Sequence, residues 1–368
     1  MEPARLRAVL ARTPGLAAGH LQACLGGHPP DDALPADLLA RLLETTLPGR
    51  TRAWLECPDN RLIDSDLRWI EANDCQIVAS VDSNFPAGWL RAGATPATVY
   101  VQGSGRLLRE PALAVVGSGQ ASAAGIDTAL GFSGELARAG LTVASGLGAG
   151  IDAAAHEGAL AAGGRTIALC ATGLDQVYPA AHARLAARIR THGVLVSVFA
   201  PGTPLQRYHF PLRNRLLGAL AAGALVVEAT AGSGALSIAQ QVQRLGKPLF
   251  AIPGSIRDPA ARCCNQLIRD GATLVQRPCE ILQKLRIHHN DQGVMRLKRP
   301  APAAQSGSSP LDNNYEMLLD AAGFEPVDID VLAFRTGWSG HTVASMLLLL
   351  ELQGRVAPQP GGRYCRLS

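Results

Sequence analysis

Short apolar runs recur along the chain from about residue 76, and a longer segment of mixed polarity separates most of them. The runs are continuous rather than alternating, which is typical of strands that are buried on both faces of a sheet. Strands are expected at Ile77–Val81, Thr98–Gln102, Ala112–Val116, Thr142–Ala144, Thr166–Cys170, Val194–Val198, Ala224–Glu228 and Pro248–Ile252. The segments between the central runs predict helices that reach about Ala139, span Ala153–Ala162 and span Ala180–Thr191. This alternation predicts an α/β fold with a doubly wound, Rossmann-like parallel sheet.

Different patterns flank this region. Before it, helices are predicted at Pro3–Leu10, Ala17–Leu25, Asp37–Leu43 and Asp66–Asn73. After it, the stretch PAPAAQSGSSP has the composition of a linker. Beyond the linker, three helices at Tyr315–Ala322, Val327–Thr336 and His341–Leu352 precede a hairpin that turns at Gly361–Gly362. We therefore divide the chain into a small helical domain (1–74), a Rossmann-like domain (75–290), a linker (291–312) and a winged-helix-like domain (313–368).

Charge is unevenly distributed between these parts. The chain has a formal net charge of +4, but residues 111–286 alone carry 16 basic and 9 acidic side chains, a net charge of +7. Such a concentration of positive charge is expected of a module that binds a polyanion. Residues 313–368 have a net charge of −2, and their third predicted helix has no basic residue. We therefore expect a protein-contact or packing role for that domain rather than DNA reading.

The cysteines and the apolar runs bear on metal sites and on the compartment. None of the eight cysteines forms a CxxC pair or joins histidines at zinc spacing, so we expect no metal and no cofactor. The longest apolar run, Leu216–Val227, is too short to cross a bilayer. Arg5, Arg7 and Arg12 interrupt any signal-peptide core. These features predict a cytoplasmic protein that does not associate with membranes.

Small residues follow the predicted strands at their carboxyl ends, where open α/β sheets bind ligands. Turns such as Gly117–Gly119 and Ser145–Gly148 expose backbone N–H groups that suit phosphate. A dinucleotide site is not predicted, because the third glycine of that fingerprint falls on Ser122 and no acidic residue ends the second strand. No Walker lysine follows any of these turns, so ATP hydrolysis is not supported either.

Four ionisable residues near the strand ends are candidates for a chemical role. Asp152 and His156 lie four residues apart at the start of a predicted helix. They form either an acid–base pair or a carboxylate at a helix N-terminus beside a structural histidine, and we favour the second interpretation. Asp175 and Glu228 lie at or just beyond predicted strand ends, where a role in proton transfer stays open.

The run His209–Arg215, HFPLRNR, places one aromatic ring, two guanidinium groups and an amide directly before a predicted apolar helix, Leu216–Ala222. Bases of a single-stranded nucleic acid stack on aromatic rings while arginines hold its phosphates. The simpler alternative is that these residues cap and solvate the helix.

An ordered series of segments between about residues 75 and 280 resembles the DNA-processing protein A (DprA/Smf) family of bacterial recombination mediators. The segments are LAVVGS (Leu113–Ser118), SGLGAGIDAAAHEGAL (Ser145–Leu160), GRTIAL (Gly164–Leu169), GLDQVYP (Gly173–Pro179), PGTP (Pro201–Pro204), FPLRNR (Phe210–Arg215), VVEAT (Val226–Thr230), SGAL (Ser233–Leu236), AIPGS (Ala251–Ser255) and NQLIRDGATLV (Asn265–Val275). The C-terminal segment resembles that family's terminal domain, and the N-terminal helices more loosely resemble its SAM-like domain.

The resemblance implies a non-catalytic protein that binds single-stranded DNA without sequence preference, forms a homodimer and helps to load RecA in natural transformation and recombination. It implies that Phe210 stacks on a base and that Arg213 and Arg215 contact phosphates or brace the loop. The further DNA-binding positions that it implies are Ser118, Gly146, Arg207, Asn214, Ser233 and Gly234. It also suggests that Asn265–Val275 lies near the dimer face.

The chain departs from the family pattern at three positions that are usually basic, where it has Gly119, Ala149 and Gly232. Each lost phosphate contact lowers the affinity for DNA and reduces the slope of log affinity against log salt concentration by roughly one. We therefore expect weaker DNA binding than is typical of the family, unless Arg257 or Arg262 compensates.

Two other functions remain as alternatives. The lost basic residues and the acidic C-terminal domain favour a protein-interaction scaffold with weakened DNA binding. A nucleotide phosphoribohydrolase-like enzyme would need a glutamate after the glycine turn at 231–236, where Ser237 and Gln240 stand instead.

Overall fold

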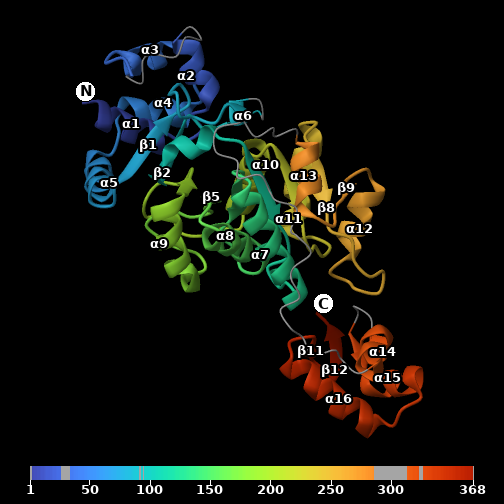
Figure 1. Cartoon of the computed structure of the whole chain (residues 1–368). Helices are drawn as coiled ribbons and strands as arrows, with labels where there is room; N and C mark the ends of the chain where they lie inside the picture. Colours follow the sequence, from blue (N-terminus) through green and yellow to red (C-terminus); the bar gives the residue numbers. More distant parts are fainter. Residues whose placement is uncertain are drawn as a thin grey trace. The chain divides into compact units, whose positions relative to one another are not determined.

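A nine-stranded sheet forms the centre of the first of two units in the computed structural model (Figure 1). The structure describes residues 2–25, 34–90, 93, 95–285, 313–322 and 326–367. The first unit is Met1–His288 and the second is His289–Ser368. The predicted linker, 291–312, lies outside the described residues.

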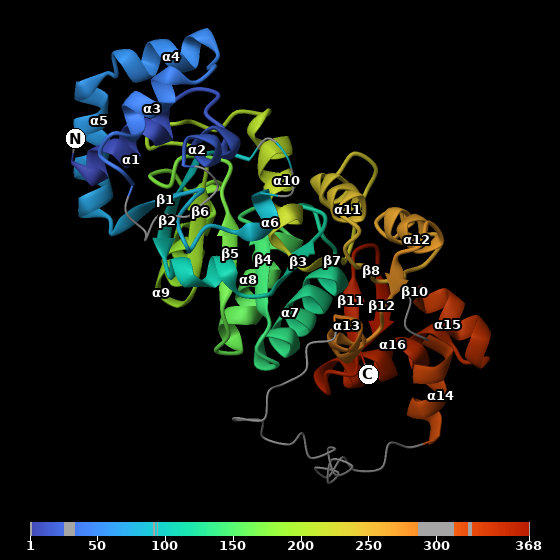
Figure 2. The same cartoon turned by 90° about the horizontal axis from the view of Figure 1, so that it is seen from above.

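The strands lie in the order β1-β2-β6-β5-β4-β3-β7-β8-β9, which can be followed from β1 to β8 in Figure 2. Strands β3 to β9 are parallel to one another, whereas β1 and β2 extend one edge in antiparallel pairing. Their bounds are β1 Cys75–Ala79, β2 Thr98–Gly103, β3 Ala112–Val116, β4 Thr142–Gly146, β5 Thr166–Leu169, β6 Val194–Ser197, β7 Gly223–Val226, β8 Leu249–Ala251 and β9 Thr273–Leu274. The predicted α/β fold with a doubly wound, mostly parallel sheet is confirmed.

The order of the strands places a switch point between β3 and β7. The chain builds outward from β3 to β6, then returns to add β7 on the other side of β3. The chain leaves β3 toward β4 and leaves β7 toward β8, in opposite directions. A crevice therefore opens outside the carboxyl ends of β3 and β7, where such sheets bind ligands.

Helices cover both faces because alternate strand residues point to opposite sides. Leu113 and Val115 of β3 pack with α7 (Ala123–Arg138) and α8 (Ile151–Ala161), while Ala114 and Val116 pack with α10 (His209–Leu220) and α11 (Gly234–Arg244). The remaining elements of this part are α6 Ala87–Leu90, α9 Ala183–His192, α12 Arg262–Arg269, α13 Pro278–Lys284, η1 Gly105–Arg109 and η2 Ala180–His182. Because successive residues of a strand pack on opposite faces, both faces of the sheet must be apolar, and this is why the strands read as continuous apolar runs.

The start of α10 corrects the sequence analysis. The run HFPLRNR was placed before the helix, but α10 begins at His209 and contains the whole run. Pro211 is compatible with this position because the first N–H groups of a helix have no partner inside it. The helix is held at both ends: His209 Nδ1 lies 2.8 Å from Ala171 O, and Lys247 Nζ donates to Ala219 O and Ala221 O at 2.6 Å each.

Five N-terminal helices share a hydrophobic core with β1 and β2. They are α1 Pro3–Arg12, α2 Ala18–Cys24, α3 Leu38–Glu44, α4 Gly49–Glu56 and α5 Asn60–Ala72. The sequence analysis missed α4 and started α5 too late, although Asp59 caps α5 by accepting from Arg61 N and Leu62 N at 3.0 and 3.2 Å. The proposed boundary at residue 74 lies between α5 and β1, within elements that pack together.

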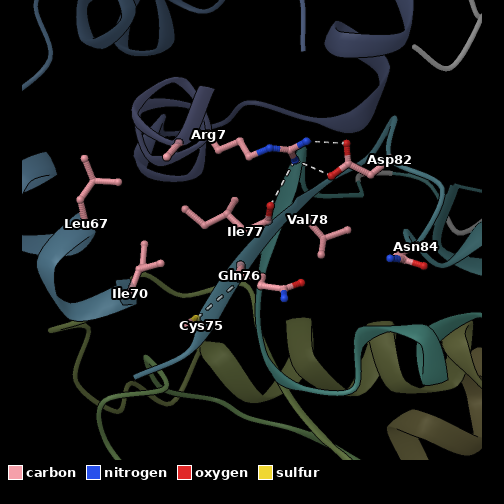
Figure 3. Close-up of a pocket in the computed structure, with 10 residues that line it drawn as sticks. Arg7, Leu67, Ile70, Cys75, Gln76, Ile77, Val78, Asp82 and Asn84 are labelled. Carbon is pink, nitrogen blue, oxygen red and sulfur yellow. Dashed lines mark hydrogen bonds and ion pairs between the residues drawn. The ribbon is translucent and has the colours of Figure 1, made fainter. Parts of the chain in front are cut away.

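An ion pair covers part of the open edge of β1, which is an outer strand of the sheet (Figure 3). Arg7 Nη1 donates to Ile77 O at 3.1 Å, Asp82 Oδ2 accepts from Ala79 N at 2.8 Å, and Arg7 and Asp82 pair with each other. Two backbone groups that a further strand would use are therefore occupied. A mostly apolar hollow of about 390 Å³ lies beside the pair, between α1, α5 and β1.

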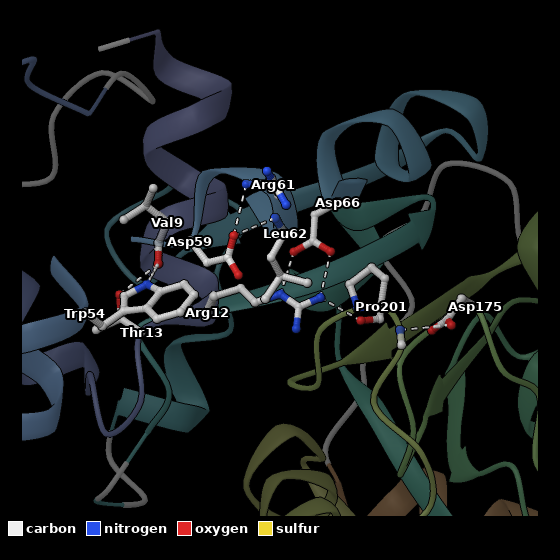
Figure 4. A network of polar contacts seen from close by, with 11 residues as sticks. Val9, Arg12, Thr13, Trp54, Asp59, Arg61, Leu62, Asp66, Asp175 and Pro201 are labelled. Carbon is white, nitrogen blue, oxygen red and sulfur yellow. Dashed lines mark hydrogen bonds and ion pairs between the residues drawn. The ribbon is translucent and has the colours of Figure 1, made fainter. Parts of the chain in front are cut away.

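A second ion pair joins α1, α5 and the loop after β6 (Figure 4). Arg12 donates to both carboxylate oxygens of Asp66, at 2.6 and 2.7 Å, and to Pro201 O at 2.7 Å. Burial alone would lower the pKa of Arg12, but the hydrogen bonds and charge of Asp66 outweigh burial and raise it. The Arg12 side chain therefore keeps its charge at the junction of three segments.

The second unit contains α14 Asn313–Ala322, β10 Val327–Asp328, α15 Ile329–Thr336, α16 Gly340–Leu352, β11 Val356–Gln359 and β12 Arg363–Arg366. Its three strands pair in the order β10-β12-β11, and Gly361 and Gly362 turn the β11–β12 hairpin with φ of 85° and 74°. The helix predicted at Val327–Thr336 begins two residues later in the structure, at Ile329, because Val327 and Asp328 pair with Tyr364 and Arg363 in the sheet. The predicted winged-helix-like arrangement is otherwise confirmed.

Replacing Arg12 by alanine should destabilise the first unit, because Asp66 is only 2% exposed and would keep a buried charge without its partner. We expect the free energy of unfolding to fall by about 3–5 kcal/mol, measured by urea denaturation. Arg61→Ala, at an exposed position on α5, is the matched control. Equal, small losses in the two variants would contradict this role for the Arg12–Asp66 pair.

Candidate nucleic-acid interface

A cleft of about 460 Å³ opens at the switch point. Four groups of residues line it, from the end of β3, the start of α8, the first turns of α10 and the start of α11. They are Val116, Gly117 and Gly119; Gly148, Ala149 and Asp152; Phe210, Pro211, Arg213 and Asn214; and Gly232, Ser233, Gly234, Ala235, Ser237 and Ile238. Segments that are more than a hundred residues apart in the chain therefore form one site.

Two glycines allow the walls of the cleft to come together. A Cβ at Gly117 would lie 2.5 Å from Ile151 Cγ1 and 2.7 Å from Glu228 O, so this turn packs directly on α8 and on the chain after β7. A Cβ at Gly146 would collide with Arg213 Nη1. The guanidinium of Arg213 therefore lies directly against the backbone at the end of β4.

Arg213 is the central cation of the cleft. The residue is only 8% exposed, and its Nε and Nη1 have no hydrogen-bond partner among the described residues. Nη1 lies 3.6 Å from Asp152 Oδ2, which is an ion-pair distance but too long for a hydrogen bond. Buried donors are nearly always hydrogen-bonded, so a guanidinium in this state beside a cleft is a candidate for a functional role.

Phe210 and Asn214 share the face of α10 that carries Arg213. The three residues follow the i, i+3, i+4 spacing of one helix face, and the Arg213 guanidinium carbon lies 5.7 Å from the centre of the Phe210 ring. Asn214 Nδ2 donates to Gly234 O at 3.2 Å, while its Oδ1 is buried without a partner among the described residues. This face therefore presents a ring, a cation and an amide to the same space.

Two helices, α8 and α11, begin beside the cleft, and the first N–H group of α8, on Ile151, donates to Ser118 O at 3.1 Å. Asp152 lies in the first turn of α8, and Ser233 is the N-cap of α11. The Ser233 side chain makes no capping bond, and its hydroxyl is buried with no partner among the described residues. Such helix N-termini attract anions through both their N–H groups and their dipoles.

The structure separates the nine site residues expected from the sequence into two groups. Five of them line the cleft, namely Phe210, Arg213, Asn214, Ser233 and Gly234. The other four do not line it. Ser118 Oγ accepts from Gln120 N at 3.1 Å within its own turn, Gly146 lies behind Arg213, Arg207 is exposed on the turn before α10, and Arg215 is half-buried on another face of that helix.

The candidates for acid–base chemistry have structural partners. His156 is fully buried, with Nδ1 2.6 Å from Thr166 Oγ1 and Nε2 2.6 Å from Gly146 O, and burial lowers its pKa. Asp175 Oδ2 accepts from Gly202 N at 2.9 Å. Glu228 accepts from both the backbone N–H and the hydroxyl of Ser122, the N-cap of α7. His156 therefore links β4 and β5, while Asp175 supports the loop at Gly202 and Glu228 supports the start of α7.

Sequence reasoning named Asp152 but did not place it against Arg213. Its position in the first turn of a helix that follows a parallel strand was the available signal, since that turn lies at the ligand-binding edge. Pro211 and Ser237, which also line the cleft, carried no signal of their own.

Other features of a site are not found in the described part of the chain. No three His, Cys, Asp or Glu side chains gather there in a way that would hold a metal ion. No helix in the same residues has the length and apolar character needed to cross a membrane. In the second unit, α16 has no Lys or Arg, and it exposes Leu348, Leu349 and Leu352, the last at 78%.

Comparisons with known proteins show which family the chain resembles. The family model described as DNA recombination-mediator protein A matches residues 76–286, and a DprA winged helix domain model matches residues 300–362. Protein Smf of Escherichia coli K12 is 37% identical over 310 residues, which are 83% of this chain and 81% of that protein. The DNA processing protein DprA of Streptococcus pneumoniae is 39% identical over 191 residues, which are 51% of this chain and 66% of that protein.

Two solved structures of such proteins resemble the fold. The crystal structure of DprA from Streptococcus pneumoniae has a TM-score of 0.65 at 28% identity, covering 78% of this chain and 99% of that one. DprA from Helicobacter pylori, whose single-stranded DNA binding mode was studied, has a TM-score of 0.52 at 26% identity, covering 58% of this chain and 95% of that one.

If Glu228 is a structural acceptor, Glu228→Ala should leave the N–H and hydroxyl of Ser122 without their partner. We expect the free energy of unfolding to fall by about 1–3 kcal/mol in urea denaturation. Glu228→Gln keeps one acceptor oxygen and should lose less, and Glu135→Ala, at an exposed position on α7, should change little. A Glu228→Ala protein as stable as the unmodified chain would contradict this role.

Proposed function

We propose a function from the premise that this chain belongs to the DNA recombination-mediator protein A family. In this proposal the chain binds single-stranded DNA without sequence preference, in the cleft between β3 and β7, and acts in DNA recombination. The observation that carries the proposal is the buried Arg213, whose Nε and Nη1 have no hydrogen-bond partner among the described residues, beside the ring of Phe210. Single-strand sites combine these two elements, a fixed cation and a stacking surface.

One phosphate would lie between Arg213 and the start of α11, where the Ser233 hydroxyl and the first N–H groups supply further donors. The neighbouring base would stack on Phe210. Every base has a π-face, so stacking of this kind gives affinity without sequence preference. Arg207, exposed on the turn that precedes Phe210, would contact a phosphate outside the cleft.

The role that we propose is binding rather than catalysis. A reaction on DNA would need a free general base or nucleophile near the phosphate. His156, Asp175 and Glu228 are instead bonded to structural partners, and Asp152 faces the Arg213 guanidinium.

The remaining parts of the proposal rest on the family resemblance. We propose that the protein acts in the cytoplasm as a homodimer and delivers DNA to RecA. One feature that suits self-association is β9, the outer strand at the far edge of the sheet, where Leu274 is 45% exposed. The apolar outer face of α16 suits a protein partner better than DNA, because a DNA-reading helix needs donors and positive charge there.

Two substitutions should separate stacking from phosphate binding. Phe210→Ala should weaken binding of a labelled oligo-dT by about 1–3 kcal/mol, measured by fluorescence anisotropy. Arg213→Met should also weaken binding, and should reduce the slope of log affinity against log salt concentration by about 0.7, the value for one phosphate of a single strand. Tyr208→Ala and Arg244→Gln, at exposed positions outside the cleft, are the matched controls. A salt slope near zero for the unmodified chain, or full affinity in both cleft variants, would refute the proposed site.

A basic residue restored at the rim of the cleft should strengthen binding. Gly119 is the suitable position, because the nearest atom to a Cβ there is Ala149 O at 3.9 Å, whereas Gly232 has φ of 81° and would be strained by any side chain. Gly119→Arg should raise the affinity for oligo-dT and steepen the salt slope by about 0.7. Gly119→Gln, which adds length without charge, should do neither. Equal affinity in the arginine and glutamine variants would contradict the place that we assign to DNA.

A further inference from the structure

The cleft contains one anionic side chain, although its proposed ligand is an anion. Asp152 lines the cleft, and its side chain is 14% exposed. Its Oδ2 lies 3.6 Å from Arg213 Nη1. Among the residues that are described as lining this space, Asp152 and Arg213 are the two ionisable ones, so their formal charges cancel.

Asp152 also occupies the usual place of a bound anion. The first turn of α8 presents the partial positive charge of the helix dipole. In many phosphate sites that charge faces the ligand, but here the carboxylate of the helix's own residue lies beside it. The cleft therefore attracts an anion through Arg213, the start of α11 and the Ser233 hydroxyl, while a fixed negative charge stands within reach of the same anion.

A fixed negative charge does not oppose all phosphates equally. A phosphodiester inside a DNA strand carries one negative charge, while a phosphomonoester carries nearly two above its second pKa of about 6. Because the charges of Arg213 and Asp152 cancel, the second negative charge of the monoester gains little attraction in the cleft. At short range, in this partly buried space, Asp152 repels it.

We infer that Asp152 makes this cleft selective for phosphodiesters over phosphomonoesters. The inference rests on the proposed function, because it assumes that the cleft holds a DNA phosphate. Its consequence is that free nucleotides and phosphorylated strand ends compete poorly with the interior of a DNA strand. Asp152 is in this view a specificity-determining residue that costs some affinity for all phosphates in exchange for discrimination between them.

The test uses two competitors that differ by one negative charge and one methyl group. The full chain is bound to labelled oligo-dT at pH 8, and the complex is titrated to millimolar concentrations with thymidine 5′-monophosphate or with its methyl ester. Both competitors carry the same base and sugar, so the change in the ratio of their inhibition constants on Asp152→Asn isolates the effect of Asp152 on the second charge. The methyl ester should compete at least about ten-fold better with the unmodified chain, in line with one short-range charge repulsion.

Asp152→Asn should bring the two inhibition constants to within about two-fold of each other and should raise the affinity for oligo-dT. Asp152→Glu keeps the charge and should keep the preference, so it tests whether any substitution at this position removes the preference. Asp127→Asn, at an exposed position on α7, should change neither value. Circular dichroism melting of each variant checks that it is folded.

The outcomes separate the inference from the function on which it rests. If the unmodified chain does not bind oligo-dT, the proposed function fails. If it binds oligo-dT but Asp152→Asn leaves the ratio unchanged, or weakens both competitors equally, Asp152 does not select between phosphates and the inference is overturned while the function stands. Failure of the methyl ester to displace oligo-dT at millimolar concentration would also overturn the inference, because the cleft would then not hold an isolated phosphodiester.

Discussion

The close approach of Arg213 to the end of β4 is the constraint on which the cleft depends. Gly146 has no Cβ, so the guanidinium can lie against the strand backbone and remain buried. The first turns of helix α10 must then lie at the carboxyl ends of the strands, and His209 and Lys247 fix the two ends of the helix. Because Phe210 and Asn214 share a helix face with Arg213, the same approach places them on the wall of the cleft. One missing methyl group at position 146 thus decides where a ring, a cation and an amide meet.

Three arginine–aspartate ion pairs in the first unit differ in geometry, and the difference separates pairs that stabilise the fold from the pair in the cleft. Arg12 with Asp66, and Arg7 with Asp82, are joined by direct hydrogen bonds, and their arginines also donate to backbone carbonyls. These two pairs close the edges and junctions of the fold. Arg213 and Asp152 are 3.6 Å apart without a hydrogen bond, and the arginine keeps two donors without a partner among the described residues. A buried guanidinium in this state is costly unless a ligand completes its bonds, so in our proposal the loose pair marks the site while the tight pairs stabilise the scaffold.

The sequence predicted strands β1 to β8 because their residues are mostly buried and therefore read as apolar runs, but it missed the two-residue β9, whose Leu274 is 45% exposed. It also identified HFPLRNR as the main motif, but it placed this run before the helix, since Pro211 reads as a helix boundary. With the helix start moved to His209, the spacing of Phe210, Arg213 and Asn214 would have assigned them to one face and left Arg215 on another. No local pattern could have shown that Asp152 faces Arg213, because that contact depends on β3 and β4 bringing α8 and α10 to the same edge. The short β10 was missed for a related reason, as two residues become a strand only through pairing with β12.

The absence of basic side chains at Gly119, Ala149 and Gly232 changes how this cleft must work. A rim rich in arginine binds DNA largely by releasing counterions, which gives strong affinity with little regard for the form of the phosphate. Here the cleft has one buried cation, offset by Asp152, and in our proposal it relies on N–H groups, a hydroxyl and an aromatic ring. These groups act over short distances, so they bind a ligand tightly only when it places a base and a single negative charge at the right separation. Negative charge alone adds little affinity. The same substitutions that lower the electrostatic contribution therefore increase the dependence of binding on the shape and charge state of the ligand.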